Sequence, residues 1–306
     1  MGVLARSTTD DGAMTTGGTS QQTRAPRPAG GRPEGSPDSR RALLLRALAM
    51  AGAALVSFAV VATVVLGSAT GQRLDRRAMD ALSSPQQTTH RLIEVMSLVS
   101  VWSVALVLAA CVVFALLRRR VAAAVAAMVL VAGANITTQV LKYDVLSRPD
   151  IGLGTTNSLP SGHTTVAVSL ALAGVLVAPA AWRSLVALLG SGGATLIGAG
   201  TVVGRWHRPG DVVAGVAVCL LWAALALAVL ALLQRDGPAP GRASALPHLT
   251  SLVGAALVGM VIVSAGVRPT GQPHSLLLAA VSLAAIGIAC AGSVGWVCRA
   301  AARHVG

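Results

Sequence analysis

Long apolar runs separated by short polar segments dominate the chain from residue 42 onward. Each run is close to the roughly 20 residues that an α-helix needs to cross a bilayer. None shows the alternation of a β-strand, and only helices and closed barrels can span lipid. The pattern predicts an all-α polytopic transmembrane helical bundle of about eight spans, at 42–67, 92–117, 121–141, 161–181, 184–204, 212–233, 250–267 and 275–298.

Two polar segments flank the first span. Residues 1–40 are rich in Gly, Ser, Thr, Pro and Arg and lack apolar periodicity, which predicts a disordered tail. The loop 68–91 carries arginines and two aspartates, and we expect an amphipathic segment that lies on the membrane surface.

Composition supports a membrane protein and argues against nucleic-acid binding. Hydrophobic residues make up 54% of the chain and charged residues only 11%. The net charge is +13, but no basic patch is interleaved with aromatic residues, so we expect no nucleic-acid partner. The four cysteines lie in or at the end of apolar runs with the spacing of neither a zinc site nor a disulfide framework, which indicates small core residues: Cys111, Cys219, Cys290 and Cys298.

Arginines indicate the orientation of the bundle. They are concentrated in the tail and after the second, fourth, sixth and eighth spans, all of which lie on one side of the membrane. The positive-inside rule makes that side cytoplasmic, so the N- and C-termini are predicted to be cytoplasmic.

Three polar clusters fall on the opposite side. Lys142 and Arg148 follow the third span, the sequence "NSLPSGHTT" opens the fourth, and "GRWHRPGD" lies between the fifth and sixth. Counting spans brings all three to the extracytoplasmic face, although tens of residues separate them.

The sequence Pro160-Ser161-Gly162-His163 has the features of an anion site at a helix start. Ser161 suits an N-cap, and Gly162 lets a ligand approach the backbone closely. Helix N-termini attract phosphate, and His163 in the same turn can donate a proton to a leaving group. An ordinary capped helix with an interfacial histidine is the alternative interpretation.

The other two clusters complete a possible phosphoryl-transfer site. Lys142 and Arg148 can bind a phosphoryl group, or alternatively snorkel to lipid headgroups. Asp211 lies four residues after His207, where it can orient that imidazole as a nucleophile. The alternatives are an interfacial histidine and a carboxylate that favours the helix N-terminus. No carboxylate cluster suits magnesium, so we expect neither a metal nor another cofactor.

These motifs resemble the type-2 phosphatidic acid phosphatase superfamily, in its integral membrane branch, which is related to vanadium haloperoxidases. The resemblance covers about residues 142–211 and implies a six-helix phosphatase core at 42–233, followed by an additional two-helix transmembrane hairpin at 250–298. It implies that His207 is the nucleophile, Asp211 its orienting partner and His163 the general acid. It also implies that phosphate is bound by Lys142, Arg148, Ser161 and Gly162.

Two features depart from the family pattern. Five residues rather than six separate Lys142 from Arg148. The family's Ser-Arg pair aligns with Gly200 and Thr201, so its phosphate-binding arginine is missing. Arg205 and Arg208 are the nearby candidates to replace it, and Arg205 is included among the predicted phosphate-binding residues.

The motifs predict a metal-independent membrane phosphatase that hydrolyses a lipid phosphate or pyrophosphate through a phosphohistidine. Polyprenyl and glycerolipid phosphates both fit, and the arginine-rich composition favours a bacterial plasma membrane. The alternative is a catalytically weakened family member that binds or transports anionic lipids.

Overall fold

The computed structural model describes residues 37–152, 157–233 and 245–301. Residues 1–36 of the predicted tail lie outside the described residues. The remaining tail residues, 37–40, belong to the first turn of α1. The helices are α1 (Pro37–Val65), α2 (Ala69–Asp80), α3 (Gln86–Ser97), α4 (Val101–Leu117), α5 (Val121–Val140), the π-helical turn η1 (Leu141–Val145), α6 (Gly162–Val177), α7 (Ala180–Val203), α8 (Pro209–Leu233), α9 (Leu246–Ser264) and α10 (Ser275–Ala301).

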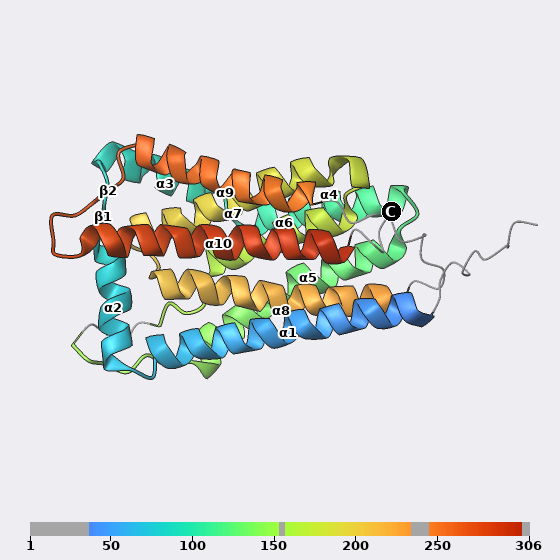
Figure 1. Cartoon of the computed structure of the whole chain (residues 1–306), viewed down its shortest axis with the longest axis horizontal. Coiled ribbons are helices and arrows are strands. Elements are labelled where there is room, and N and C mark those ends of the chain that lie inside the picture. Colours follow the sequence, from blue (N-terminus) through green and yellow to red (C-terminus); the bar gives the residue numbers. More distant parts are fainter. Residues whose placement is uncertain (1–36, 153–156, 234–244, 302–306) are drawn as a thin grey trace, which may run out of the picture. The chain divides into compact units, whose positions relative to one another are not determined.

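Most of the long helices run side by side, and the short helix α2 lies across one end of the bundle (Figure 1). Ser68 caps α2 by accepting a hydrogen bond from the backbone N–H of Gly71 at 3.2 Å. The buried face of α2 carries Gln72, Asp75 and Met79, which are spaced for one side of a helix. The amphipathic segment expected in the loop 68–91 is therefore helical at 69–80.

Among the described residues, six helices are long and apolar enough to cross a membrane: α1, α5 with η1, α7, α8, α9 and α10. The fourth predicted span corresponds to the shorter apolar helix α6, of 16 residues. The second predicted span is not continuous, because α3 and α4 meet at an angle of 56°. Ser100 and Ser103 form a reciprocal capping box that starts a new helix there.

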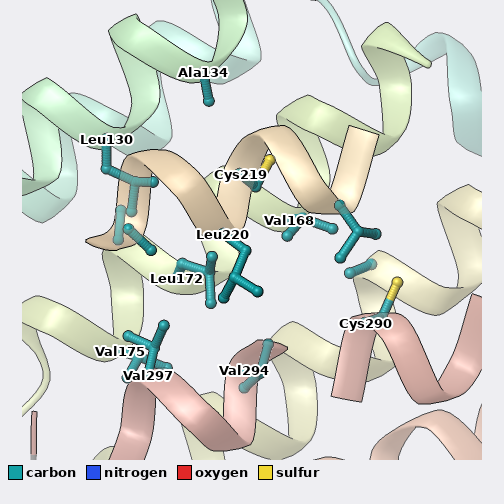
Figure 2. Close-up of a cluster of buried hydrophobic side chains, with 14 of the residues drawn as sticks. Leu130, Ala134, Val168, Leu172, Val175, Cys219, Leu220, Cys290, Val294 and Val297 are labelled. Carbon is teal, nitrogen blue, oxygen red and sulfur yellow. The ribbon is translucent and has the colours of Figure 1, made fainter. Parts of the chain in front are cut away.

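The core lies around α8, which packs against α1, α5, α6 and α10. Figure 2 shows Leu130 of α5 and Leu172 of α6 beside Leu220 of α8 and Val294 of α10. Cys219 and Cys290 belong to the same apolar cluster, and all four cysteines are free thiols. The interpretation of the cysteines as small core residues is confirmed for the three that are fully buried, while Cys111 is half-buried.

The helices α9 and α10 pack against the other helices along their length. α9 lies against α7, where the hydroxyl of Ser191 donates a hydrogen bond to the carbonyl oxygen of Ser251 at 2.7 Å. α10 contacts α6, α7 and α8. Two-residue strands also pair antiparallel, β1 (Leu82–Ser83) with β2 (Arg268–Pro269), and tie the loop after α2 to the loop before α10.

Candidate functional site

The three polar clusters meet at the end of the bundle that α2 crosses. The backbone N–H of Ser161, just before α6, donates a hydrogen bond to the carbonyl oxygen of Asp211 in α8 at 2.9 Å. Arg148 reaches the same aspartate from the loop after η1. The structure thus brings residues from three separate segments into one buried cluster.

The start of α6 has the geometry of an anion-binding helix terminus. The hydroxyl of Ser161 accepts the backbone N–H of Thr164 at 3.4 Å and acts as the N-cap. The N–H groups of Gly162 and His163 make no hydrogen bond to any described residue. A Cβ at Gly162 would meet only the side-chain nitrogen of Gln139, at 3.9 Å, so protein packing does not require glycine there.

Asp211 is the centre of the cluster, and its side chain is completely buried. Its Oδ1 accepts a hydrogen bond from Nη2 of Arg148 at 3.2 Å. Its Oδ2 accepts the hydroxyl of Ser158 at 2.5 Å and the backbone N–H of Arg208 at 2.9 Å. These charge-assisted bonds hold the carboxylate in one orientation.

His207 lies beside this carboxylate. Its Nδ1 is 3.6 Å from Oδ2 of Asp211, slightly beyond hydrogen-bond distance, and only 5% of the residue is exposed. The rings of His207 and His163 are neighbours, with their centroids 6.3 Å apart. His163 also contacts the ring of Trp206, at 5.3 Å between centroids. The two histidines predicted to act on opposite sides of a phosphoryl group therefore share one site.

The segment that carries Lys142 and Arg148 is fastened by a residue not singled out from the sequence. The side-chain Nδ2 of Asn157 donates to the carbonyl oxygens of Lys142 at 3.2 Å and of Leu146 at 3.0 Å. Lys142 itself is half-buried in η1 and interacts electrostatically with His163. Asn157 and Ser158 lie just before the Pro-Ser-Gly-His sequence, separated from it by Leu159. Only this position in the sequence could have indicated that the two residues belong to the site.

The structure separates the two candidates for the missing arginine. Arg205 has a left-handed backbone, with φ of 59°, and its guanidinium pairs with Asp80 of α2 at 2.5 Å. About half of the Arg205 side chain is exposed. Only 6% of Arg208 is exposed, and its backbone N–H donates to Oδ2 of Asp211. Arg205 is therefore held in a surface ion pair with Asp80, whereas Arg208 is buried next to Asp211.

Helix α2 contributes two further residues to the site. Nε2 of Gln72 donates to the carbonyl oxygen of Pro149, next to Arg148, at 3.3 Å. Oδ1 of Asp75 accepts the backbone N–H of Gly210 at 2.8 Å, at the start of α8. Burial, followed by the charge of Asp211, raises the pKa of Asp75 from 3.8 to about 6. In the sequence, Asp75 is one of the two aspartates of the loop 68–91, and no motif there predicts its place in the site.

An apolar cavity of about 310 Å³ adjoins the cluster. Valine, leucine and alanine side chains from α1, α2, α8 and α10 form most of its wall. The cavity reaches Asp75 and Gly210, so its polar end lies against the N-terminus of α8.

Comparisons with known proteins connect this site to one family. The model of the PAP2 superfamily matches residues 123–235, which span α5 to α8 and include all three polar clusters. Neither the curated proteins nor the solved structures contain a match. Helix α2, with Asp75, lies outside the matched segment, as do α9 and α10. The match confirms the resemblance drawn from the motifs for residues 123–235, which are similar to the PAP2 superfamily, in which phosphate-ester hydrolysis is the general activity.

Proposed function

We propose that the protein is an integral membrane phosphatase that hydrolyses a lipid phosphate or pyrophosphate without a metal. The buried cluster around Asp211 is the observation that carries this proposal. It places an oriented carboxylate, two histidines, a guanidinium and a helix N-terminus together. Phosphoryl transfer needs these groups, because it depends on positioning and on neutralising the charge of the phosphoryl oxygens.

The proposed reaction has two steps. Asp211 orients His207, whose free ring nitrogen attacks phosphorus, while His163 gives its proton to the leaving oxygen of the lipid. This step breaks the phosphorus–oxygen bond and forms a phosphohistidine. Water then attacks the phosphohistidine, His163 takes up a proton from that water, and phosphate leaves. The 3.6 Å between His207 and Asp211 suits a resting site, since such contacts often shorten when substrate binds.

The apolar cavity supports a lipid as the substrate. Most of its wall belongs to the candidate membrane spans α1, α8 and α10, and its polar end lies beside the cluster at Gly210. A hydrocarbon chain in this cavity would remain in apolar surroundings while the phosphate group stays near Asp211.

Arginines at the other end of the bundle support an extracytoplasmic site. Arg120, after α4, donates to the carbonyl oxygen of Val177, at the end of α6, at 3.5 Å. Arg183, near the start of α7, interacts electrostatically with Arg120 and with Cys298 of α10. This arginine-rich end lies opposite α2 (Figure 1). The positive-inside rule places it in the cytoplasm.

A second function is favoured by one observation. Thr201 stands where the family pattern has a phosphate-binding arginine, and its hydroxyl donates to the carbonyl oxygen of Gly198 at 2.8 Å. A family member that lacks this charge would bind or transport anionic lipids without turnover. Hydrolysis that depends on His207 separates the two functions.

The test is phosphate release by the purified full-length protein in detergent with EDTA. The panel includes polyprenyl phosphates and pyrophosphates, phosphatidic acid and phosphatidylglycerol phosphate. We expect release from at least one lipid, loss of release in His207→Ala, and normal release in the control His90→Ala, which removes an exposed histidine of α3. Binding of these lipids with no release from any of them would favour the binding function.

The membrane side is tested with single cysteines. Gly271→Cys lies in the loop before α10, at the site end, where an added Cβ meets nothing within 4 Å. Arg118→Cys lies at the opposite end. In intact cells, a membrane-impermeant thiol reagent should label position 271 and should reach position 118 only after permeabilisation. The reverse pattern would place the site in the cytoplasm.

A further inference from the structure

Buried polar atoms without hydrogen-bond partners are concentrated at this site. Among the described residues, ten buried side-chain nitrogen and oxygen atoms make no hydrogen bond, and six of them belong to this site. Four of those six are nitrogens. The six atoms are Nδ1 of His207, Nε and Nη1 of Arg148, Nη1 of Arg208, Oδ2 of Asp75 and Oε1 of Gln72.

An unsatisfied buried guanidinium nitrogen is costly, because its hydrogen bonds to water are lost and not replaced. Arg148 uses Nη2 to bind Asp211, which leaves its other two nitrogens for another acceptor. The guanidinium of Arg208 is buried beside it without such a carboxylate contact. Two adjacent guanidiniums with free N–H groups form a site that an oxyanion completes.

The charges in the cluster favour the same ligand. Arg148 and Arg208 repel each other, and burial, followed by the charge of Arg148, lowers the pKa of Arg208. Oδ1 of Asp211 already accepts a hydrogen bond from Arg148, and Oδ1 of Asp75 accepts the backbone N–H of Gly210. A bound phosphoryl group would offset the repulsion between the two arginines, since it carries the opposite charge.

The position of Arg208 also accounts for the missing motif arginine. The family pattern places an arginine six residues before the nucleophilic histidine, and this chain has the uncharged Thr201 at that position. Arg208 follows His207 directly, its side chain is buried, and its backbone N–H donates to the carboxylate of Asp211. Arg205, by contrast, is held by Asp80 on the surface of α2.

We propose that Arg208 is a phosphate-binding residue that supplies the charge missing at position 201. Its guanidinium and that of Arg148 bind the oxygens of the phosphoryl group, and both guanidiniums stabilise the charge that develops during transfer. This inference rests on the proposed function for the identity of the substrate, but the anion site itself does not require turnover.

The experiment measures inorganic phosphate binding to the full-length protein in detergent by calorimetry, and hydrolysis of the best lipid in parallel. The variants are Arg208→Gln, Arg208→Lys and Arg205→Gln. Arg73→Gln is the control, because it removes an exposed arginine of the same helix α2. Thermal unfolding of each variant accompanies both measurements.

We expect Arg208→Gln to weaken phosphate binding at least tenfold and to lower kcat/KM by about 10²–10³, the usual effect of removing one donor to a developing charge. Arg208→Lys should recover part of both, because it keeps the charge but loses the two-pronged geometry. Arg205→Gln and Arg73→Gln should leave both quantities within about twofold, the range for surface charges. If the glutamine variant does not fold, Arg208→Met repeats the test with an apolar side chain.

The outcomes separate this inference from the proposed function. Wild-type affinity in Arg208→Gln, or a comparable loss in Arg205→Gln, overturns the role of Arg208 even if the protein is a phosphatase. Phosphate binding that depends on Arg208, in a protein that hydrolyses no lipid, supports the anion site and overturns the phosphatase function.

Discussion

Replacing Asp75 with asparagine tests how charge is balanced where α2 covers the start of α8. Only 8% of Asp75 is exposed, and its Oδ1 accepts the N–H of Gly210 at 2.8 Å. Asparagine has an oxygen of the same shape, so that hydrogen bond can be kept while the titrating group is removed. Any effect of pH that depends on Asp75 should then disappear.

The sign and size of the effect follow from the pKa of Asp75, which burial and then Asp211 raise from 3.8 to about 6. Between these two values the folded protein holds a proton that the unfolded chain has already lost. The free energy of unfolding of the wild type therefore falls as pH rises through this window and is level above it. A shift of about two units corresponds to about 3 kcal/mol.

The assay is thermal unfolding of the purified protein in detergent between pH 4 and pH 7.5. We expect the Tm of Asp75→Asn relative to wild type to rise by several degrees from pH 4 to pH 6 and then to stay constant. The control is Asp80→Asn, on the same helix, whose side chain is 42% exposed. Parallel curves for wild type and Asp75→Asn would refute the reasoning, as would a variant that loses stability relative to wild type as pH rises.

Three other substitutions test individual contacts. Gly162→Ala should leave Tm unchanged, because a Cβ there meets no clash, and should weaken phosphate binding about tenfold by crowding the helix N-terminus, as calorimetry would show. Ser158→Ala removes the 2.5 Å hydrogen bond to Asp211 and should lower kcat/KM about 10-fold to 100-fold with little change in Tm. Gly254→Leu should lower Tm sharply, because a Cβ there overlaps the backbone of α7. Gly259→Leu should not, because a Cβ at Gly259 meets nothing within 4 Å.

Sequence patterns predicted most helices well because apolar length and polar breaks control membrane insertion. The exception is the second span, where the capping bonds between Ser100 and Ser103 end one helix and begin another. Two serines in an apolar run barely change its hydropathy, so the break is invisible to a pattern based on length. The start of α6 at Gly162, by contrast, could be predicted from the sequence, because serine at position 161 is a favoured N-cap residue.

The composition of the site was only partly predictable. Counting spans brought the three clusters to one end, but Arg205 and Arg208 lie three residues apart and both follow the same helix. Only the fold shows that one is paired on the surface and the other is buried. Asp75 was equally hidden, because its place beside Gly210 depends on how α2 packs across the bundle.

The close contact between α7 and α9 has a consequence for biosynthesis. Lipid tails are as apolar as leucine, so helices associate in a membrane through shape and polar contacts rather than through hydrophobicity. Gly254 lies against the backbone of α7, and Ser191 bonds to Ser251 there, while α10 also contacts α2 above the site. Helices α9 and α10 thus complete the packing of α7 and α8, so a premature stop codon after residue 233 should destabilise the whole bundle rather than remove an accessory hairpin.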